Sequence, residues 1–351
     1  MMDRADLHPR CMATAIGSLP HTDPAEACSL VLSTLPEIPP WPQLPRRSFL
    51  ENMYVQYSEG FPGVVIDAAQ EKIYVDRTRD LDPALERLYL AYLENATAGW
   101  SISPAYAQGL HQFLAGSLGK PVALKGQVTG PISWGLSVTD QNRRAILYDE
   151  VLAEALAKHL RLKAAWEESA LRSVCPQTII FVDEPYMSAF GSAFVSVSRE
   201  QVIGLLEEVF QGIAGLKGVH CCGNTDWSVL LSTSVNILNL DAYDYAESLS
   251  LYPDDVQAFL NRNGIIAWGI VPTDGAALAD ETSETLVARL EQAMGFLVEK
   301  GLSLDQILER SLITPSCGLA SVSVELAEKA MRLTSQVSAT MRKKYFEEAA
   351  R

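Results

Sequence analysis

The chain has 351 residues, a length that a single α/β barrel commonly reaches. Hydrophobic residues make up 48% of it and charged residues 20%, which supports a sizeable core and excludes an intrinsically disordered chain. The net charge of −15 argues against a nucleic-acid-binding protein, because such proteins meet phosphates with a basic face.

The N-terminal segment has no basic flank followed by an apolar stretch, and no apolar run reaches the roughly 18 residues of a membrane span. We therefore expect no signal peptide, no contact with a membrane and a cytoplasmic protein. The chain has six cysteines, at positions 11, 28, 175, 221, 222 and 317. In a non-secreted enzyme, scattered cysteines are more often buried thiols, metal ligands or catalytic groups than disulfides.

Short apolar runs alternate with longer helical patterns along the whole chain. Helix starts are indicated by Asp-Pro pairs at 23–24 and 82–83 and by a capping-box pattern from Ser198 to Gln201. The Pro-rich stretch 36–45 is predicted to form a rigid loop over one end of the fold. Eight runs are predicted to be strands, at residues 12–16, 64–67, 122–127, 178–183, 219–222, 235–240, 265–270 and 312–314.

Eight strands that alternate with helices predict a (β/α)8 TIM-type barrel, with residues 1–351 as a single domain and its core at about 11–345. A doubly wound open sheet is the alternative architecture. The second strand is the weakest of the eight, and a hairpin within residues 60–79 is the alternative there. Both architectures place reactive side chains at the carboxyl ends of the strands.

Three polar clusters follow predicted strands, at 219–224, 183–185 and 315–318. His220 and Cys222 are two positions apart in an extended segment, so their side chains share one face. In a closed barrel Cys317 can reach the same point from the last strand. An imidazole and two thiolates suit Zn²⁺, which binds four ligands tetrahedrally. The alternative is that these are ordinary buried residues, because an isolated His-x-Cys pair is a common pattern.

Asp241, at the end of the sixth predicted strand, is the preferred fourth ligand, and Asp244 and Glu247 are its competitors. Cys221 points to the opposite face and is interpreted as a packing residue. His21 follows a Gly-Ser-Leu-Pro turn and is either a substrate contact or a surface residue. Zinc held by three protein groups and one displaceable ligand is a catalytic arrangement, and its simplest use is to ionise a thiol for alkyl transfer.

Five short segments match a known family in order: Ala-Ile-Gly-Ser at 15–18, Gly-Gln-Val-Thr-Gly-Pro at 126–131, Val-Asp-Glu-Pro at 182–185, His-Cys-Cys-Gly-Asn at 220–224 and Pro-Ser-Cys-Gly at 315–318. On these segments the chain, from residue 13 to about 345, resembles the C-terminal catalytic barrel of cobalamin-independent methionine synthase. More distantly it is similar to the methylcorrinoid:coenzyme M methyltransferases. The resemblance implies a TIM-type barrel with zinc at its C-terminal mouth, bound by His220, Cys222 and Cys317. The family's fourth ligand is a glutamate, and here Asp241 stands at the matching position.

The resemblance also implies a substrate site. In the family, backbone around the Ile-Gly-Ser segment holds the carboxylate of homocysteine, which corresponds to Gly17 and Ser18. Acidic groups that match Asp183 and Glu51 hold its ammonium group, although Glu51 matches only loosely and is otherwise a capping or surface residue. Full-length synthases carry a further N-terminal barrel for which this chain has no room. A methylated corrinoid protein is therefore expected as methyl donor beside methyl-tetrahydrofolate.

We thus expect a zinc-dependent methyltransferase of methionine biosynthesis that methylates a small-molecule thiol, with homocysteine favoured. A coenzyme M-type acceptor, which has no amino group, is the first alternative. A metal-free relative of the porphyrinogen decarboxylase type would give the cysteines no reason to converge. A non-catalytic zinc-binding or corrinoid-docking module would show a closed metal site with no pocket beside it.

Overall fold

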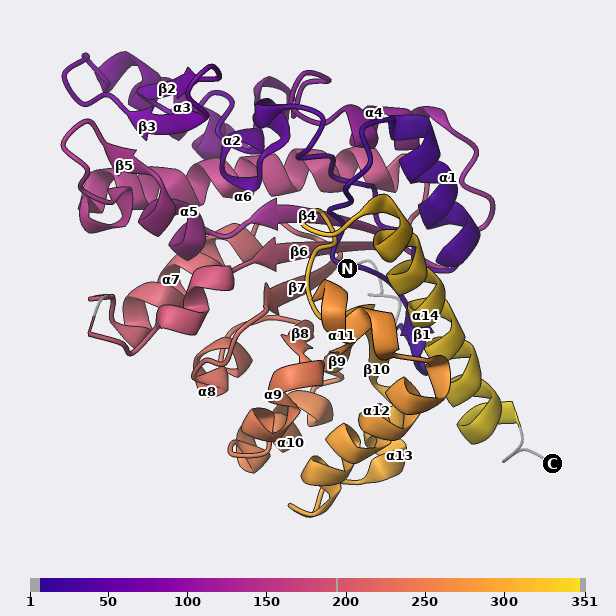
Figure 1. Ribbon diagram of the computed structural model, residues 1–351. Helices are drawn as coiled ribbons and strands as arrows, with labels where there is room; N and C mark the ends of the chain where they lie inside the picture. The colour runs from indigo at the N-terminus through magenta and orange to yellow at the C-terminus, as the bar shows by residue number, and fades with distance from the viewer. Residues whose placement is uncertain (1–6, 194, 348–351) are drawn as a thin grey trace.

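Seven parallel strands form a curled sheet in the computed structural model, which describes residues 7–193 and 195–347 (Figure 1). Their order in the sheet is β1-β10-β9-β8-β7-β6-β4. The strands are β1 (Met12–Ala13), β4 (Leu124–Thr129), β6 (Thr178–Asp183), β7 (Leu216–Cys221), β8 (Ile237–Asp241), β9 (Ile265–Val271) and β10 (Ser311–Pro315). Because this order follows the chain without reversal, it excludes the doubly wound alternative, which requires a switch point.

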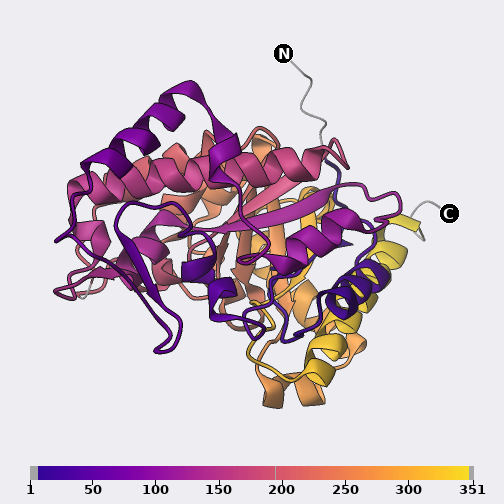
Figure 2. The ribbon, with the colours of Figure 1, turned by 90° about the horizontal axis from the view of Figure 1, so that it is seen from above.

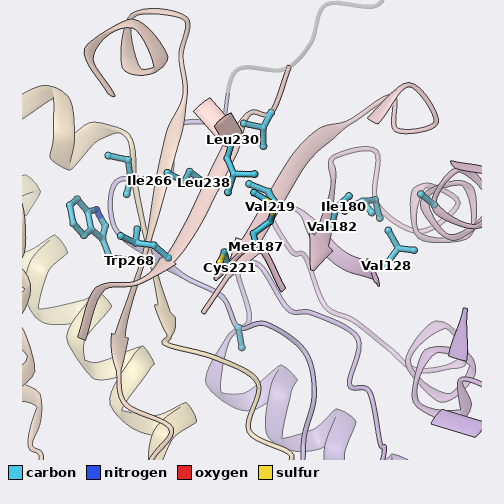
Figure 3. Close-up of a cluster of buried hydrophobic side chains, with 14 of the residues drawn as sticks. Val128, Ile180, Val182, Met187, Val219, Cys221, Leu230, Leu238, Ile266 and Trp268 are labelled. Atoms are coloured by element: carbon cyan, nitrogen blue, oxygen red, sulfur yellow. The ribbon is translucent and has the colours of Figure 1, made fainter. Parts of the chain in front are cut away.

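The strands are buried on both faces, as parallel strands covered by helices are. Every residue of β4, β6, β8, β9 and β10 is buried. Alternate residues belong to two separate apolar clusters, so that Ile179 and Phe181 pack in one and Ile180 and Val182 in the other. Part of the larger cluster, which lies between the sheet and the helices, is drawn in Figure 3; it includes Cys221, the residue predicted to pack.

The Pro-rich stretch forms no regular helix or strand, as predicted for a loop, but it lies between two strands of the sheet and not over one end of the fold. It runs between β1 and β4 and makes two isolated parallel bridges, Pro40 to Lys125 and Gln43 to Ser18. Residues 38–44 are all buried. Prolines have no N–H to donate, so this segment cannot form a regular ladder. The main sheet described by the structure therefore has seven regular strands, and its strand pairing does not close into an eight-stranded barrel.

The predicted second barrel strand belongs to a different sheet. Residues 64–67 form β2 (Val64–Asp67), which pairs antiparallel with β3 (Lys72–Val75), and β3 pairs with β5 (Thr139–Asp140). The hairpin alternative is thus confirmed, and the placement in the barrel is wrong. The carboxylate of Asp67 accepts the N–H groups of Ala69 and Gln70, each at 3.1 Å, and this local turn directs the chain back on itself.

Helices cover the outer face of the sheet (Figure 2). The longer ones are α6 (Glu150–Arg172), α14 (Val324–Arg342), α12 (Ser283–Val298), α3 (Asp82–Glu94), α7 (Arg199–Phe210) and α1 (Pro24–Thr34). The shorter ones are α2 (Met53–Gln56), α4 (Gln108–Ala115), α5 (Pro131–Ser137), α8 (Trp227–Leu231), α9 (Ala242–Leu249), α10 (Pro253–Asn261), α11 (Gly275–Asp280) and α13 (Leu304–Glu309). Within the described ranges, none is both long and apolar enough to cross a membrane.

Two of the three predicted helix starts are confirmed by their caps. Asp23 accepts the N–H groups of Ala25 and Glu26 at the start of α1, and Ser198 accepts that of Gln201 in α7. At α3 the cap residue is Leu81, without a side-chain hydrogen bond, and Asp82 lies inside the first turn. The acid still favours this end, because negative charge near a helix N-terminus is stabilising.

Candidate metal centre

A cavity of about 240 Å³ opens at the carboxyl ends of the strands. Its wall is contributed by the segments that follow β1, β6, β7 and β10 and by the Pro-rich stretch. The lining residues are Ile16, Ser18, Gln43, Pro45, Glu51, Met53, Asp183, Pro185, His220, Cys222, Cys317, Gly318, Ala320 and Ser321. Active sites of barrel folds lie at the carboxyl ends of the strands, so the cavity is where a functional site is expected.

The structure brings His220, Cys222 and Cys317 together. One ligand atom from each lies within 4.8 Å of the other two, and this is the group among the described residues that could hold a metal ion. His220 lies within β7 and Cys222 directly after it. The strands β7 and β10 are separated by β8 and β9, so the thiols meet because both lie beyond the ends of their strands.

The path of the loop that carries Cys317 depends on its neighbours. The ladder register between β10 and β9 shifts between Thr314 and Pro315, and such irregularities redirect a strand end. Ser316 then donates its backbone N–H to Val271 at 2.8 Å. A Cβ at Gly269 would lie 2.8 Å from the Cα of Ser316, so only a glycine lets this loop cross so closely.

His220 has one ring nitrogen paired and one free of partners. Its Nδ1 lies 2.5 Å from Oδ1 of Asn239, whereas Nε2 is buried and has no hydrogen-bond partner within the described chain. A buried polar atom without a partner is costly and calls for an explanation. Neighbouring thiols and an unpaired imidazole nitrogen form a donor set that fits a zinc ion.

The two thiols interact electrostatically. The hydrogen bond from Cys317 lowers the pKa of Cys222, with a further contribution from His220 that burial partly opposes. The hydrogen bond between the two thiols raises the pKa of Cys317, and burial raises it further. Burial disfavours the charged form of His220, but its contacts with Cys222 and the charge of Asp183 raise its pKa overall. Cys221 differs, because burial raises the pKa of its thiol to about 12.

Two carboxylates line the same cavity. Oδ1 of Asp183 and Oε2 of Glu51 are each buried and have no hydrogen-bond partner among the residues that the structure describes. The other oxygen of Glu51 pairs with Arg47 at 2.5 Å. Burial raises the pKa of Asp183 to about 6, against the lowering effects of His220 and Lys125. Burial also raises the pKa of Glu51, and because this side chain is only 1% exposed, the interpretation as a surface residue is wrong.

Gly17 and Ser18 lie at the edge of this cavity. Ser18 lines it, whereas Gly17 stands behind the wall in a neighbouring crevice. Gly17 has φ of +138°, and a Cβ there would lie 2.6 Å from Oε1 of Gln127. Both the backbone angle and the approach of Gln127 require glycine at this turn.

Comparison with known proteins finds two sequence relatives and solved structures with a similar fold. No family model matches the chain. A methionine synthase of Methanocaldococcus jannaschii is 25% identical over 227 residues, which are 65% of this chain and 67% of that protein. A UDP-N-acetylglucosamine--N-acetylmuramyl-(pentapeptide) pyrophosphoryl-undecaprenol N-acetylglucosamine transferase of Thermotoga neapolitana is 24% identical over 224 residues, and the match spans 59% of this chain and 61% of that protein.

The two sequence relatives carry different names, and solved structures add a comparison of the fold. The structure of a B12-independent methionine synthase from Shewanella sp. W3-18-1 superposes with a TM-score of 0.59 at 16% identity, and covers 96% of this chain and 99% of that one. The fold is similar to that of a B12-independent methionine synthase. The resemblance inferred from the five sequence segments is thereby confirmed.

One predicted ligand of the methionine synthase-like site does not join the others. Asp241 is not in the group of three, and its Oδ1 caps α9 by accepting the N–H of Asp244 at 3.1 Å. Burial raises the pKa of Asp241 to about 7. The side chain is one methylene shorter than the glutamate expected in the family. Asp244 and Glu247 are exposed and do not line the cavity, so neither replaces it.

His21 also lies outside the methionine synthase-like cavity. It is only 4% exposed and faces a separate open groove beside α1, so it is neither a substrate contact in this cavity nor a surface histidine. Sequence reasoning missed Gln43 and Asn239. Gln43 lay in the stretch interpreted as a loop. Asn239 could have been found, because it is a polar residue between two leucines in the interior of the strand sequence Ile-Leu-Asn-Leu-Asp.

Proposed function

We propose that this protein is a zinc-dependent methyltransferase that methylates the thiol of homocysteine to form methionine. The observation that carries the proposal is the lining of one cavity. It combines the convergent His220, Cys222 and Cys317 with two carboxylates that each keep a buried oxygen without a partner. The methionine synthase fold supports it, and the Shewanella relative was solved in complex with selenomethionine, the selenium counterpart of the proposed product.

The residues of the metal group would divide the binding between one nitrogen and two sulfurs. His220 would offer Nε2, because Nδ1 is engaged by Asn239, and Cys222 and Cys317 would offer their thiolates. A zinc ion held there would keep an incoming thiol ionised at neutral pH, where a free thiol is mostly protonated. Three protein ligands beside a cavity are typical of a catalytic site, and a closed structural site would have no such cavity.

The cavity wall would recognise the amino-acid part of the acceptor. The unpartnered oxygens of Asp183 and Glu51 would accept hydrogen bonds from its ammonium group. Ser18 lines the cavity and would face the carboxylate, while Gly17, behind the wall, would shape the turn that places Ser18 there. These contacts hold the sulfur in one orientation, which lowers the entropy barrier to attack. An acceptor without an amino group would leave one buried oxygen of Asp183 and one of Glu51 without a hydrogen-bond donor, and this provides selectivity.

The transfer itself is a displacement at carbon. The acceptor sulfur forms a new S–C bond while the bond between the methyl group and its donor breaks, and the bonding pair leaves with the donor. A methylated corrinoid protein as donor requires no proton, because the corrinoid accepts that pair. Methyl-tetrahydrofolate would in addition require a proton on its nitrogen.

The proposal is tested by incubating zinc-loaded protein with homocysteine and either methylcobalamin or methyl-tetrahydrofolate, followed by an assay for methionine. The matched control acceptors are 4-mercaptobutanoate, which is homocysteine without its amino group, and coenzyme M. Methionine should form faster than either control product. Faster methylation of coenzyme M would favour that acceptor instead. If zinc binds but no thiol is methylated by either donor, the catalytic proposal is wrong.

A further inference from the structure

Asn239 contacts the strands on both sides of β8 and also β10. It is fully buried. Its Oδ1 lies 2.5 Å from Nδ1 of His220 on β7, and its Nδ2 donates to the backbone carbonyl of Ala267 on β9 at 2.9 Å and to Oγ1 of Thr314 on β10 at 2.8 Å. A buried amide with three such contacts is held in one orientation.

The contact with Ala267 determines which way round the amide lies. A carbonyl oxygen can only accept a hydrogen bond, so the nitrogen of Asn239 must face Ala267 and its oxygen must face His220. An accepting oxygen at 2.5 Å requires the proton of the neutral imidazole on Nδ1. The lone pair then lies on Nε2, the buried atom without a partner.

We infer that Asn239 is a positioning residue that fixes His220 in its Nδ1–H tautomer and so presents Nε2 as a metal ligand. This inference rests on the proposed function, since that function makes His220 a ligand. Groups that bind the second nitrogen of a metal-binding histidine commonly set its tautomer and ring orientation.

The same amide also links the two strands that deliver ligands. Thr314 lies three residues before Cys317, and His220 lies two residues before Cys222. The side chain of Asn239 thus forms hydrogen bonds both to Thr314, near the end of β10, and to His220, near the end of β7. An apolar residue at 239 would release His220 to exchange tautomers or rotate, without removing any metal ligand.

The test uses two readouts on the full chain. In zinc-free, reduced protein labelled with ¹⁵N-histidine, long-range ¹H–¹⁵N spectra recorded at a pH where the His220 ring is neutral distinguish the two tautomers, and a His220→Gln variant assigns the resonance. Wild-type His220 should carry its proton on Nδ1, and Asn239→Leu should show a mixture of tautomers. Zinc affinity, measured by competition with a chromophoric chelator, should fall about 10- to 100-fold in Asn239→Leu.

Thr314→Val is the matched control. It removes one hydrogen bond of Asn239 from the same buried layer but leaves the contact with Ala267, so the tautomer should not change and zinc affinity should fall less than threefold. An Nε2–H tautomer in the wild type would overturn the inference, even if Asn239→Leu did not fold. Equal losses of affinity in the two variants would also overturn it, because the effect would then be one of packing. If the wild type bound no zinc, the proposed function would fail, while the spectra would still decide the tautomer.

Discussion

Replacing Asp183 by Asn removes the carboxylate that we assign to the ammonium group of homocysteine. Glu51 already shares one oxygen with Arg47, whereas Asp183 keeps Oδ1 buried without a partner, so Asp183 should carry the larger part of the interaction. Breaking a buried, hydrogen-bonded charge pair costs about 2–5 kcal/mol. Because Glu51 remains in the variant, we expect the lower part of that range, about 2–3 kcal/mol. At about 1.4 kcal/mol per tenfold, KM for homocysteine should rise roughly 30- to 140-fold.

The assay compares homocysteine with 4-mercaptobutanoate at a fixed, saturating donor concentration. Asp183→Asn should leave KM for 4-mercaptobutanoate within about threefold, because that thiol makes no ammonium contact. Glu184→Gln is a control for removing a buried carboxylate at the same strand end. Its oxygens accept the backbone N–H groups of Ile132 and Ser133 and it does not line the cavity, so the ratio of the two KM values should stay constant. Equal effects of Asp183→Asn on both thiols would refute the reasoning.

Three further results are expected. Methyl transfer should be abolished by chelation of zinc, and equally by Cys222→Ser or Cys317→Ser. The circular dichroism spectrum and the melting temperature should change little, because the apolar core of a chain this size supplies its folding energy. Unfolding on chelation would show a structural metal instead. Since burial raises the pKa of Asp183 to about 6, the carboxylate is ionised above that pH and protonated below it, so the kcat/KM preference for homocysteine over 4-mercaptobutanoate should fall as the pH drops through that region. A nearby bound cation moves this transition to lower pH, and a preference that did not vary with pH would contradict the assignment. Gly17→Ala should lower the free energy of unfolding by more than about 1 kcal/mol, because of its φ of +138° and the 2.6 Å approach to Gln127, and an unchanged urea midpoint would count against this.

The strand-end residues could be predicted from the sequence because their signals are local. His220 and Cys222 follow a continuous apolar run, and the two-residue period of a strand places their side chains on one face. Cys317 follows a second such run, and strand ends of a parallel sheet meet at one edge. Buried apolar strands therefore locate the candidate site without any knowledge of how far apart the strands lie in the sheet.

Other features depend on contacts between distant residues and could not be read from local patterns. The prolines of residues 36–45 interrupt the strand pattern, so nothing in the sequence indicates that this stretch lies between β1 and β4. Asp241 matched a ligand position, but its carboxylate caps the helix that starts at the next residue. The partner of Asn239 is 19 residues away, and only the pairing of β7 with β8 brings the two side chains together.

The Pro-rich segment gives the cavity one compliant side. Prolines 39, 40 and 42 have no N–H, so residues 38–43 are joined to their neighbours by isolated bridges, whereas β7 is paired along continuous ladders on both sides. Local fluctuations of the cavity wall should therefore be largest where Gln43 and Pro45 line the cavity. Amide hydrogen exchange should be faster in this segment than in β7 and β10. Acceptors of different size can then be accommodated by displacement on this side, while the spacing of the sulfur and nitrogen ligands stays constant.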